Sequence, residues 1–96
     1  MNMSDPLMHI ADISQNGVTG HVTLHAYIVE VTEEGEARGP VETHGIDPLS
    51  LQRLYGEVEA DPIGKWLAAV KARMLERHQI RKGMHANLHQ KVGTRI

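Results

Sequence analysis

The stretch HVTLHAYIVEVT, residues 21–32, decides the fold. It is rich in β-branched residues and contains Tyr27, a composition that favours a β-strand. Alternate side chains of a strand point to opposite faces, so this strand would have two apolar faces. One face would carry Val22, Leu24, Ala26 and Ile28, and the other Tyr27, Val29 and Val31 together with Met8, Ile10 and Val41 from neighbouring strands. We therefore predict a long central strand.

The preceding segment supplies a first neighbour for this strand. Asn16-Gly17 is typical of a two-residue hairpin turn. Such a turn would place Asp12 opposite His21, with Ile10 opposite Thr23 and Met8 opposite His25. Residues 6–14 also match a short helix, because Asp5-Pro6 is a helix-start pair. We prefer the strand, since the Asn-Gly turn needs a partner for residues 21–32.

The following segment supplies the second neighbour. Glu33-Glu34-Gly35 suits a three-residue turn with glycine in the left-handed conformation, which would place Glu30 opposite Arg38 and Tyr27 opposite Val41. A two-residue loop would instead oppose Glu33 and Glu36, which repel each other.

Two Asp-Pro pairs mark helix starts, because the aspartate caps the helix and proline has no N–H to lose. After Pro48, the apolar residues Leu51, Leu54 and Val58 suit a short helix that ends near Gly56. After Pro62, a helical pattern runs to about Gly83, or resumes beyond it through Leu88; its apolar positions are Ile63, Trp66, Leu67, Val70 and Met74.

These elements predict one α+β domain over residues 1–96: a three-stranded antiparallel β-meander followed by a short helix and a long basic C-terminal helix. The meander would span residues 8–44, the helical part 48–90 and a loose tail 91–96. A chain of 96 residues suits a single domain.

Several classes of protein are excluded by composition. No apolar run approaches the ~18 residues that a membrane span needs. The first residues lack the basic and apolar regions of a secretory signal. The absence of cysteine excludes disulfides and thiolate metal sites. We expect a cytoplasmic protein without membrane contact.

The net charge of −2 conceals a strong asymmetry along the chain. Residues 1–62 carry a net charge of −9 and residues 63–96 a net charge of +7, by count of Asp, Glu, Lys and Arg. Two interpretations remain open. The basic helix binds an acidic partner, or it packs near the acidic sheet and offsets its field.

No catalytic or cofactor motif is visible, so we predict neither an enzyme nor a cofactor. Ser4, Ser14 and Ser50 lie in no nucleophile motif, and the glycines form no phosphate loop. His85 and His89, four residues apart, could share one helix face and form a weak metal site. His78 would lie about 10 Å from His85 along the helix axis, too far to join it.

The sequence favours a non-enzymatic protein-interaction module: an adaptor, regulator or inhibitor, of the kind encoded by phages and mobile elements. Its expected partner is a protein with an acidic surface, and we expect a homodimer that covers the second apolar sheet face. The alternative is a nucleic-acid-binding protein that uses the basic C-terminal segment. The candidate binding residues are Lys65, Arg73, Arg77, Arg81, Lys82, Lys91 and Arg95 on the basic helix, and Tyr27, Val29, Val31 and Val41 on the sheet.

Overall fold

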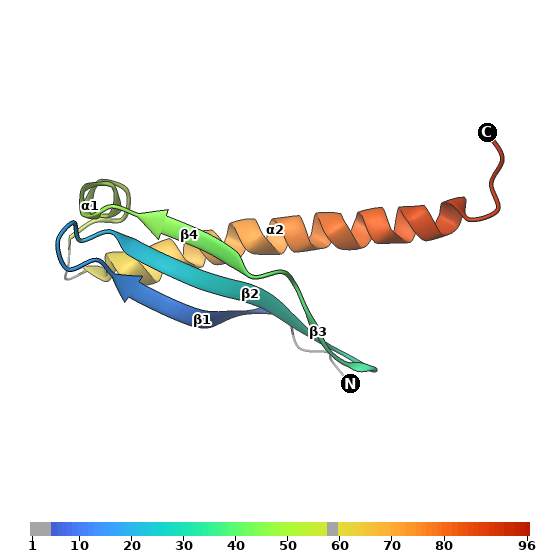
Figure 1. Ribbon diagram of the computed structural model, residues 1–96, viewed down its shortest axis with the longest axis horizontal. Coiled ribbons are helices and arrows are strands. Elements are labelled where there is room, and N and C mark those ends of the chain that lie inside the picture. Colours follow the sequence, from blue (N-terminus) through green and yellow to red (C-terminus); the bar gives the residue numbers. More distant parts are fainter. Residues whose placement is uncertain (1–4, 58–59) are drawn as a thin grey trace.

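The computed structural model describes residues 5–57 and 60–96. It consists of an antiparallel sheet with two helices after it, which confirms the α+β class (Figure 1). The elements are β1 (Leu7–Gln15), β2 (Val22–Thr32), β3 (Gly35–Arg38), β4 (Glu42–Ile46), α1 (Pro48–Tyr55) and α2 (Pro62–Lys91).

The sheet has four strands where the sequence predicts three. β2 is central and pairs with β1 on one edge; β3 and β4 pair in succession along its other edge. The predicted third strand is interrupted at residues 39–41, where Pro40 has no N–H to donate to a strand ladder. The backbone N–H of Gly39 still donates to the carbonyl oxygen of Ile28 at 2.8 Å, so the chain follows β2 through the break.

Residues 7–15 are a strand, so the helical alternative for residues 6–14 is wrong. The predicted β1–β2 register is also wrong, because the connection has six residues instead of two. The side chain of Asn16 accepts hydrogen bonds from the N–H groups of Val18 and Thr19, at 2.8 and 3.0 Å. Positive φ occurs at Gly20, not at Gly17. Asn16 therefore organises a longer loop, which asparagine side chains do readily.

The new register moves two residues to the other face of the sheet. Met8 lies opposite Ile28 and Ile10 opposite Ala26, so both belong to the core face and not to the outer face with Tyr27. A β-bulge at Ala11 then shifts the pairing by one residue. Asp12 consequently lies opposite His25, and the predicted Asp12–His21 pair does not form.

The β2–β3 turn also differs from the prediction. Its loop is Glu33-Glu34, with Thr32 opposite Gly35, Val29 opposite Arg38 and Glu30 opposite Ala37. The Thr32 hydroxyl donates to the carbonyl oxygen of Gly35 at 2.8 Å, which closes the shorter loop. Glutamates 33 and 34 occupy the loop itself, so the predicted repulsion between Glu33 and Glu36 does not arise.

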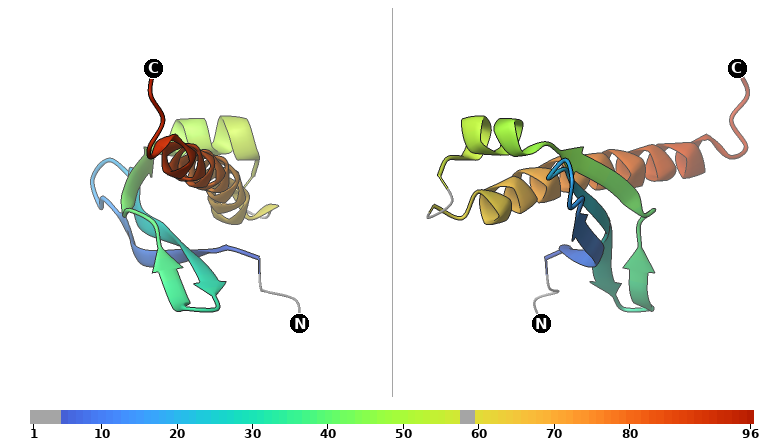
Figure 2. Two further views of the ribbon diagram at one scale, coloured as in Figure 1. Left: turned by 90° about the vertical axis from the view of Figure 1, so that its right-hand side faces the viewer. Right: turned by 60° about the vertical axis from the view of Figure 1, so that its left-hand side comes forward.

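The core lies between the sheet and the first half of α2 (Figure 2). Trp66, Val70 and Met74 are almost completely buried and follow one another at four-residue spacing. They pack against the predicted apolar face of β2, which consists of Val22, Leu24, Ala26 and Ile28. Alternation along β2 thus gives one buried face, as predicted.

Both helices begin at the predicted Asp-Pro pairs. The Asp47 carboxylate accepts from the N–H of Ser50 at 3.0 Å, and that of Asp61 from the N–H of Gly64 at 3.0 Å. α1 ends at Tyr55 with Gly56 as its C-cap, which confirms the predicted end near Gly56, whereas Val58 lies outside the described residues. α2 continues through Gly83 without a break and ends at Lys91. The predicted end near Gly83 is therefore wrong, and the alternative in which the helix extends through Leu88 is confirmed.

Candidate functional site on the distal arm of α2

α2 extends well beyond the sheet that it covers (Figure 1). Its 30 residues give a length of about 45 Å. His78 is its last buried residue, and from Gln79 onward every residue except the half-buried Arg81 is exposed. We call residues 80–91 the distal arm. A helical segment without a core behind it is unusual, since packing supplies most helix stability in proteins.

The distal arm carries a stripe of exposed apolar side chains. Ile80, Met84 and Leu88 are 55%, 59% and 66% exposed. Their four-residue spacing places them next to one another on one face of the helix. Met84 and Leu88 also border a shallow depression of about 240 Å³, shared with Asn87 and Lys91. The sequence analysis missed this stripe, although its periodicity is visible in the sequence.

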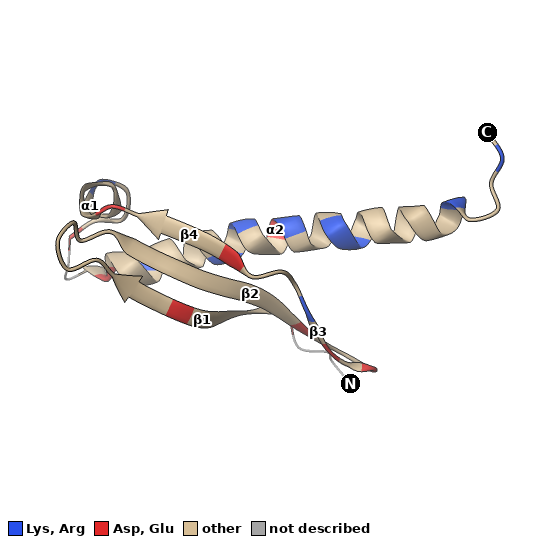
Figure 3. Ribbon diagram, in the orientation of Figure 1, with Lys and Arg blue, Asp and Glu red and all other residues tan. Residues whose placement is uncertain are grey.

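The charged side chains of the arm are all basic: Arg81, Lys82 and Lys91 (Figure 3). No aspartate or glutamate follows Glu76, so residues 77–96 contain only basic charged side chains. The acidic side chains lie mainly on the sheet, including the tip of the β2–β3 hairpin. The charge asymmetry of the sequence therefore becomes a spatial one, with a positive arm beyond a negative sheet.

Two sheet carboxylates attach α2 to the sheet. Glu30 accepts from Lys82 Nζ at 2.8 Å and contacts His78 Nε2 at 3.0 Å. The hydrogen bonds from Lys82 and His78 hold the pKa of Glu30 below its ordinary value, despite its partial burial. On the same face, Glu42 accepts from Arg77 and contacts His44 Nε2 at 3.1 Å. Burial raises the pKa of Glu42, but hydrogen bonds from Arg77 and His44 outweigh it, so the net shift is downward.

These contacts separate two of the seven predicted basic residues from the other five. Arg77 and Lys82 contact sheet carboxylates, and Lys65 lies in the first turn of α2, at the end opposite the arm. Within the described part of the chain, no carboxylate lies within ion-pair distance of the remaining four: Arg73, Arg81, Lys91 and Arg95. Neutralisation of the sheet accounts for Arg77 and Lys82, but not for Arg73, Arg81, Lys91 and Arg95.

The outer sheet face is only partly apolar. Tyr27, Val29 and Val31 share this face, whereas Val41 lies in the segment between β3 and β4, so the predicted Tyr27–Val41 pair is wrong. The ring of Tyr27 lies 4.9 Å from that of His9 and 5.5 Å from the guanidinium of Arg38. Farther along the face, His25 Nδ1 contacts the hydroxyl of Thr43 at 3.0 Å. The exposed apolar area is thus confined to one end of the face.

His85 and His89 do lie together on the arm, with ring centroids 4.8 Å apart in an edge-to-face arrangement. His78 is buried against Glu30 instead. Among residues 5–57 and 60–96, no group of three or more histidine, aspartate or glutamate side chains is placed to hold a metal ion. The two rings therefore provide at most two ligands.

No family of known proteins, no curated protein and no solved structure matches this chain. Over the part of the chain that is described, neither helix combines the length and the apolar character that crossing a bilayer requires.

Proposed function

We propose that this chain is a small non-enzymatic interaction module, an adaptor or regulator, that binds an acidic partner protein through the distal arm. One observation carries the proposal: α2 leaves the sheet as an exposed helix with the apolar stripe Ile80, Met84 and Leu88 beside basic residues. An amphipathic helix with anchors at such spacing is a common way to occupy a groove on another protein.

Neither packing against the sheet nor its own helix propensity stabilises the arm much. Among the described residues, Lys82 is the one arm residue that donates a hydrogen bond to the sheet, and Gly83 in the interior of the arm costs about 1 kcal/mol of helix stability relative to alanine. Isolated helices of this length are marginal in water. A partner that covers the apolar stripe would supply the missing packing.

The side chains of the arm suit a protein better than a nucleic acid. Nucleic-acid binding by a basic helix needs phosphate contacts, and binding to single strands adds aromatic stacking. The arm has no Phe, Tyr or Trp, and Arg77 and Lys82 contact sheet carboxylates. The apolar side chains of Ile80, Met84 and Leu88 cannot form favourable contacts with phosphates, but they would fit an apolar groove with acidic walls on another protein.

We further propose that the module is a cytoplasmic homodimer, so that each assembly presents two arms. The sheet supports self-association because its β1 edge has no pairing strand among the described residues. Two arms on one assembly would raise the apparent affinity for a partner with two binding sites.

Affinity capture from the native host, with nuclease added, tests the proposal. The bait is the full chain, compared with a Met84→Ser/Leu88→Ser variant and with a matched control, Leu49→Ser/Leu54→Ser, on exposed positions of α1. We expect a captured protein whose dissociation constant rises at least tenfold with the arm variant and stays unchanged with the control. Binding should also weaken with added salt and with Arg81→Glu/Lys91→Glu, which reverses the two basic arm residues that have no sheet carboxylate within ion-pair distance among the described residues.

Three results would contradict the proposal. The first is capture that depends on nucleic acid and disappears with nuclease. The second is a partner that binds both double-serine variants equally well. The third is binding that does not respond to salt or to charge reversal.

A further inference from the structure

β1 is an edge strand whose core face is poorly covered. Only β2 pairs with it among the described residues, and all of its nine residues except Met8 are exposed. Ile10 and Ile13 lie opposite the buried Ala26 and Leu24, yet they are 38% and 40% exposed. Apolar side chains on the core face of a sheet are normally buried, so the cover over β1 is incomplete.

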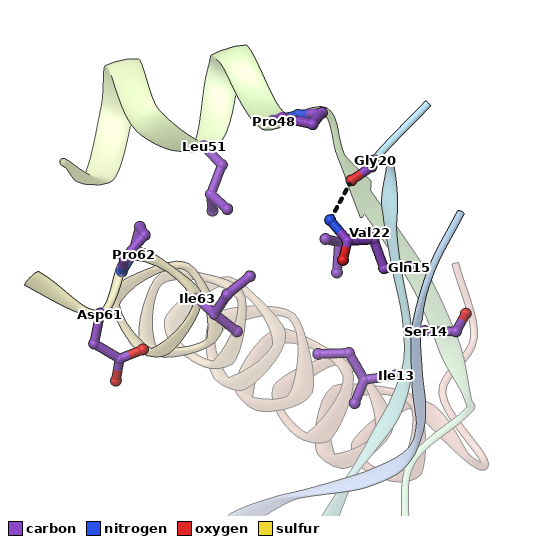
Figure 4. Close-up of a pocket in the computed structure, with 10 residues that line it drawn as sticks. All are labelled: Ile13, Ser14, Gln15, Gly20, Val22, Pro48, Leu51, Asp61, Pro62 and Ile63. Atoms are coloured by element: carbon purple, nitrogen blue, oxygen red, sulfur yellow. Dashed lines mark hydrogen bonds between the residues drawn. The ribbon is translucent and has the colours of Figure 1, made fainter. Parts of the chain in front are cut away.

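The gap in this cover is a groove between the end of β1 and the start of α2, with Pro48 and Leu51 of α1 along its other side. Ile13 and Ile63 line the same pocket, of about 500 Å³, where α2 begins (Figure 4). Leu67 follows Ile63 on the same flank of α2 after one turn, and both pack only partly buried against the core. The opposite flank of α2 faces β4, because Arg77 binds Glu42 there. The groove thus has an apolar wall from each element and an unpaired strand edge beside it.

We infer that a second copy of this chain fills the groove, by antiparallel pairing of β1 with β1 of that copy about a two-fold axis perpendicular to the sheet. This inference rests on the proposed homodimer and names its interface. The two sheets become one, and both α2 helices lie on the same side of it. Neighbouring strands are about 4.8 Å apart, so helices over the two β2 strands are about 14 Å apart. The side chains of Ile10, Ile13 and Leu67 from both copies fill that space.

The bulge at Ala11 restricts the register. Before the bulge, Leu7 and His9 point to the outer face; after it, Asp12 and Ser14 do. A two-fold pairing must place outer-face residues opposite outer-face residues on both sides of the bulge. Pairing His9 with Asp12 of the second copy meets this condition, and it places Met8 opposite Ile13 on the core face.

This register is also favoured electrostatically. It places an imidazole opposite a carboxylate twice, once on each side of the axis. In this register Ala11 lies opposite Ile10. The next register that fits the bulge, two residues away, places His9 opposite Ser14 and Asp12 opposite Ala11, so both imidazole–carboxylate pairs are lost. The assembly closes on itself, and its new outer edges are the β3–β4 edges, which Pro40 interrupts.

Engineered disulfides test the register, because the chain has no cysteine. In the full-length chain, His9→Cys/Asp12→Cys should form covalent dimers on mild oxidation. Residues 9 and 12 of one strand are about 10 Å apart, too far for a bond within one copy. Neither single variant should cross-link by itself, and a mixture of the two single variants should. His9→Cys/Ser14→Cys is the matched control for the neighbouring register, and we expect little covalent dimer from it.

Light scattering of variants with an added charge tests which face of the sheet lies in the dimer interface. Ile10→Lys should raise the dimer dissociation constant at least tenfold, whereas Val31→Lys, on the outer face, should leave it unchanged. A wild-type chain that is monomeric up to high micromolar concentration would overturn both the inference and the proposed homodimer. A dimer broken by Val31→Lys but not by Ile10→Lys, or cross-linked mainly by His9→Cys/Ser14→Cys, would overturn the inference and leave the homodimer standing.

Discussion

Glu30 connects the sheet to α2. Its carboxylate, on β2, binds His78 and Lys82 of α2, which lie far from it in the sequence. Sequence reasoning could predict that acidic and basic halves attract. It could not identify this contact, since the partners are 48 and 52 residues away along the chain. The contact also explains why a buried histidine follows the apolar residues of α2: His78 has a carboxylate to bond with.

We expect Glu30→Gln to lower the free energy of unfolding by about 1.5–3 kcal/mol at pH 7, the usual range for a hydrogen bond to a charged group. The folded pKa of Glu30 lies below its ordinary value of 4.5. Its stabilisation is therefore complete above that value and is lost as the pH falls through the folded pKa. Urea unfolding at pH 7 and at pH 3 should show a smaller loss of stability in the variant than in the wild type. Glu36→Gln, at an exposed ion pair with Arg38, is the control; an equal acid-induced loss in Glu30→Gln and wild type would refute this role.

Helix starts could be predicted from the sequence because their chemistry is local, whereas strand registers could not. Asp47-Pro48 and Asp61-Pro62 each begin a helix within a few residues of the signal. The β1–β2 register depends on how Asn16 hydrogen-bonds in its loop and on a bulge at Ala11, and the alternating pattern of residues reveals neither. An error of one residue in such a register exchanges the two faces, which is what happened to Met8 and Ile10.

Two alanine substitutions in the β1–β2 loop distinguish the loop found here from a two-residue Asn-Gly turn. Gly20 has a φ of 77°, and a Cβ atom there would lie 2.6 Å from Pro48 Cγ. Gly20→Ala should therefore cost about 1–3 kcal/mol. Gly17→Ala should be nearly neutral, since its Cβ would meet nothing within 4 Å. Thermal or urea unfolding measures both. A large cost at Gly17 with tolerance at Gly20 would restore the two-residue turn and its register.

The assembled molecule combines features that the sequence predicts with others that only the arrangement of its elements reveals. The basic character of α2 could be predicted by counting charges. How far α2 extends beyond the sheet depends on where the strands end. Whether β1 has an open groove beside it depends on which strand α2 covers. Both features leave apolar side chains exposed at places where another chain can reach them. These exposed side chains are the observations that support the proposed partner and the proposed homodimer.

Site-specific photo-crosslinking in the native host tests the role of the distal arm most directly. A photoreactive amino acid is placed at residue 84 on the arm, at residue 31 on the outer sheet face, or at residue 54 on α1, all of them exposed positions. We predict a discrete adduct from residue 84 that resists nuclease, in which the crosslinked peptide comes from an acidic segment of another protein. Adducts from residue 31 or 54 with none from residue 84, or an adduct at residue 84 that consists of nucleic acid, would contradict binding of a protein by the arm.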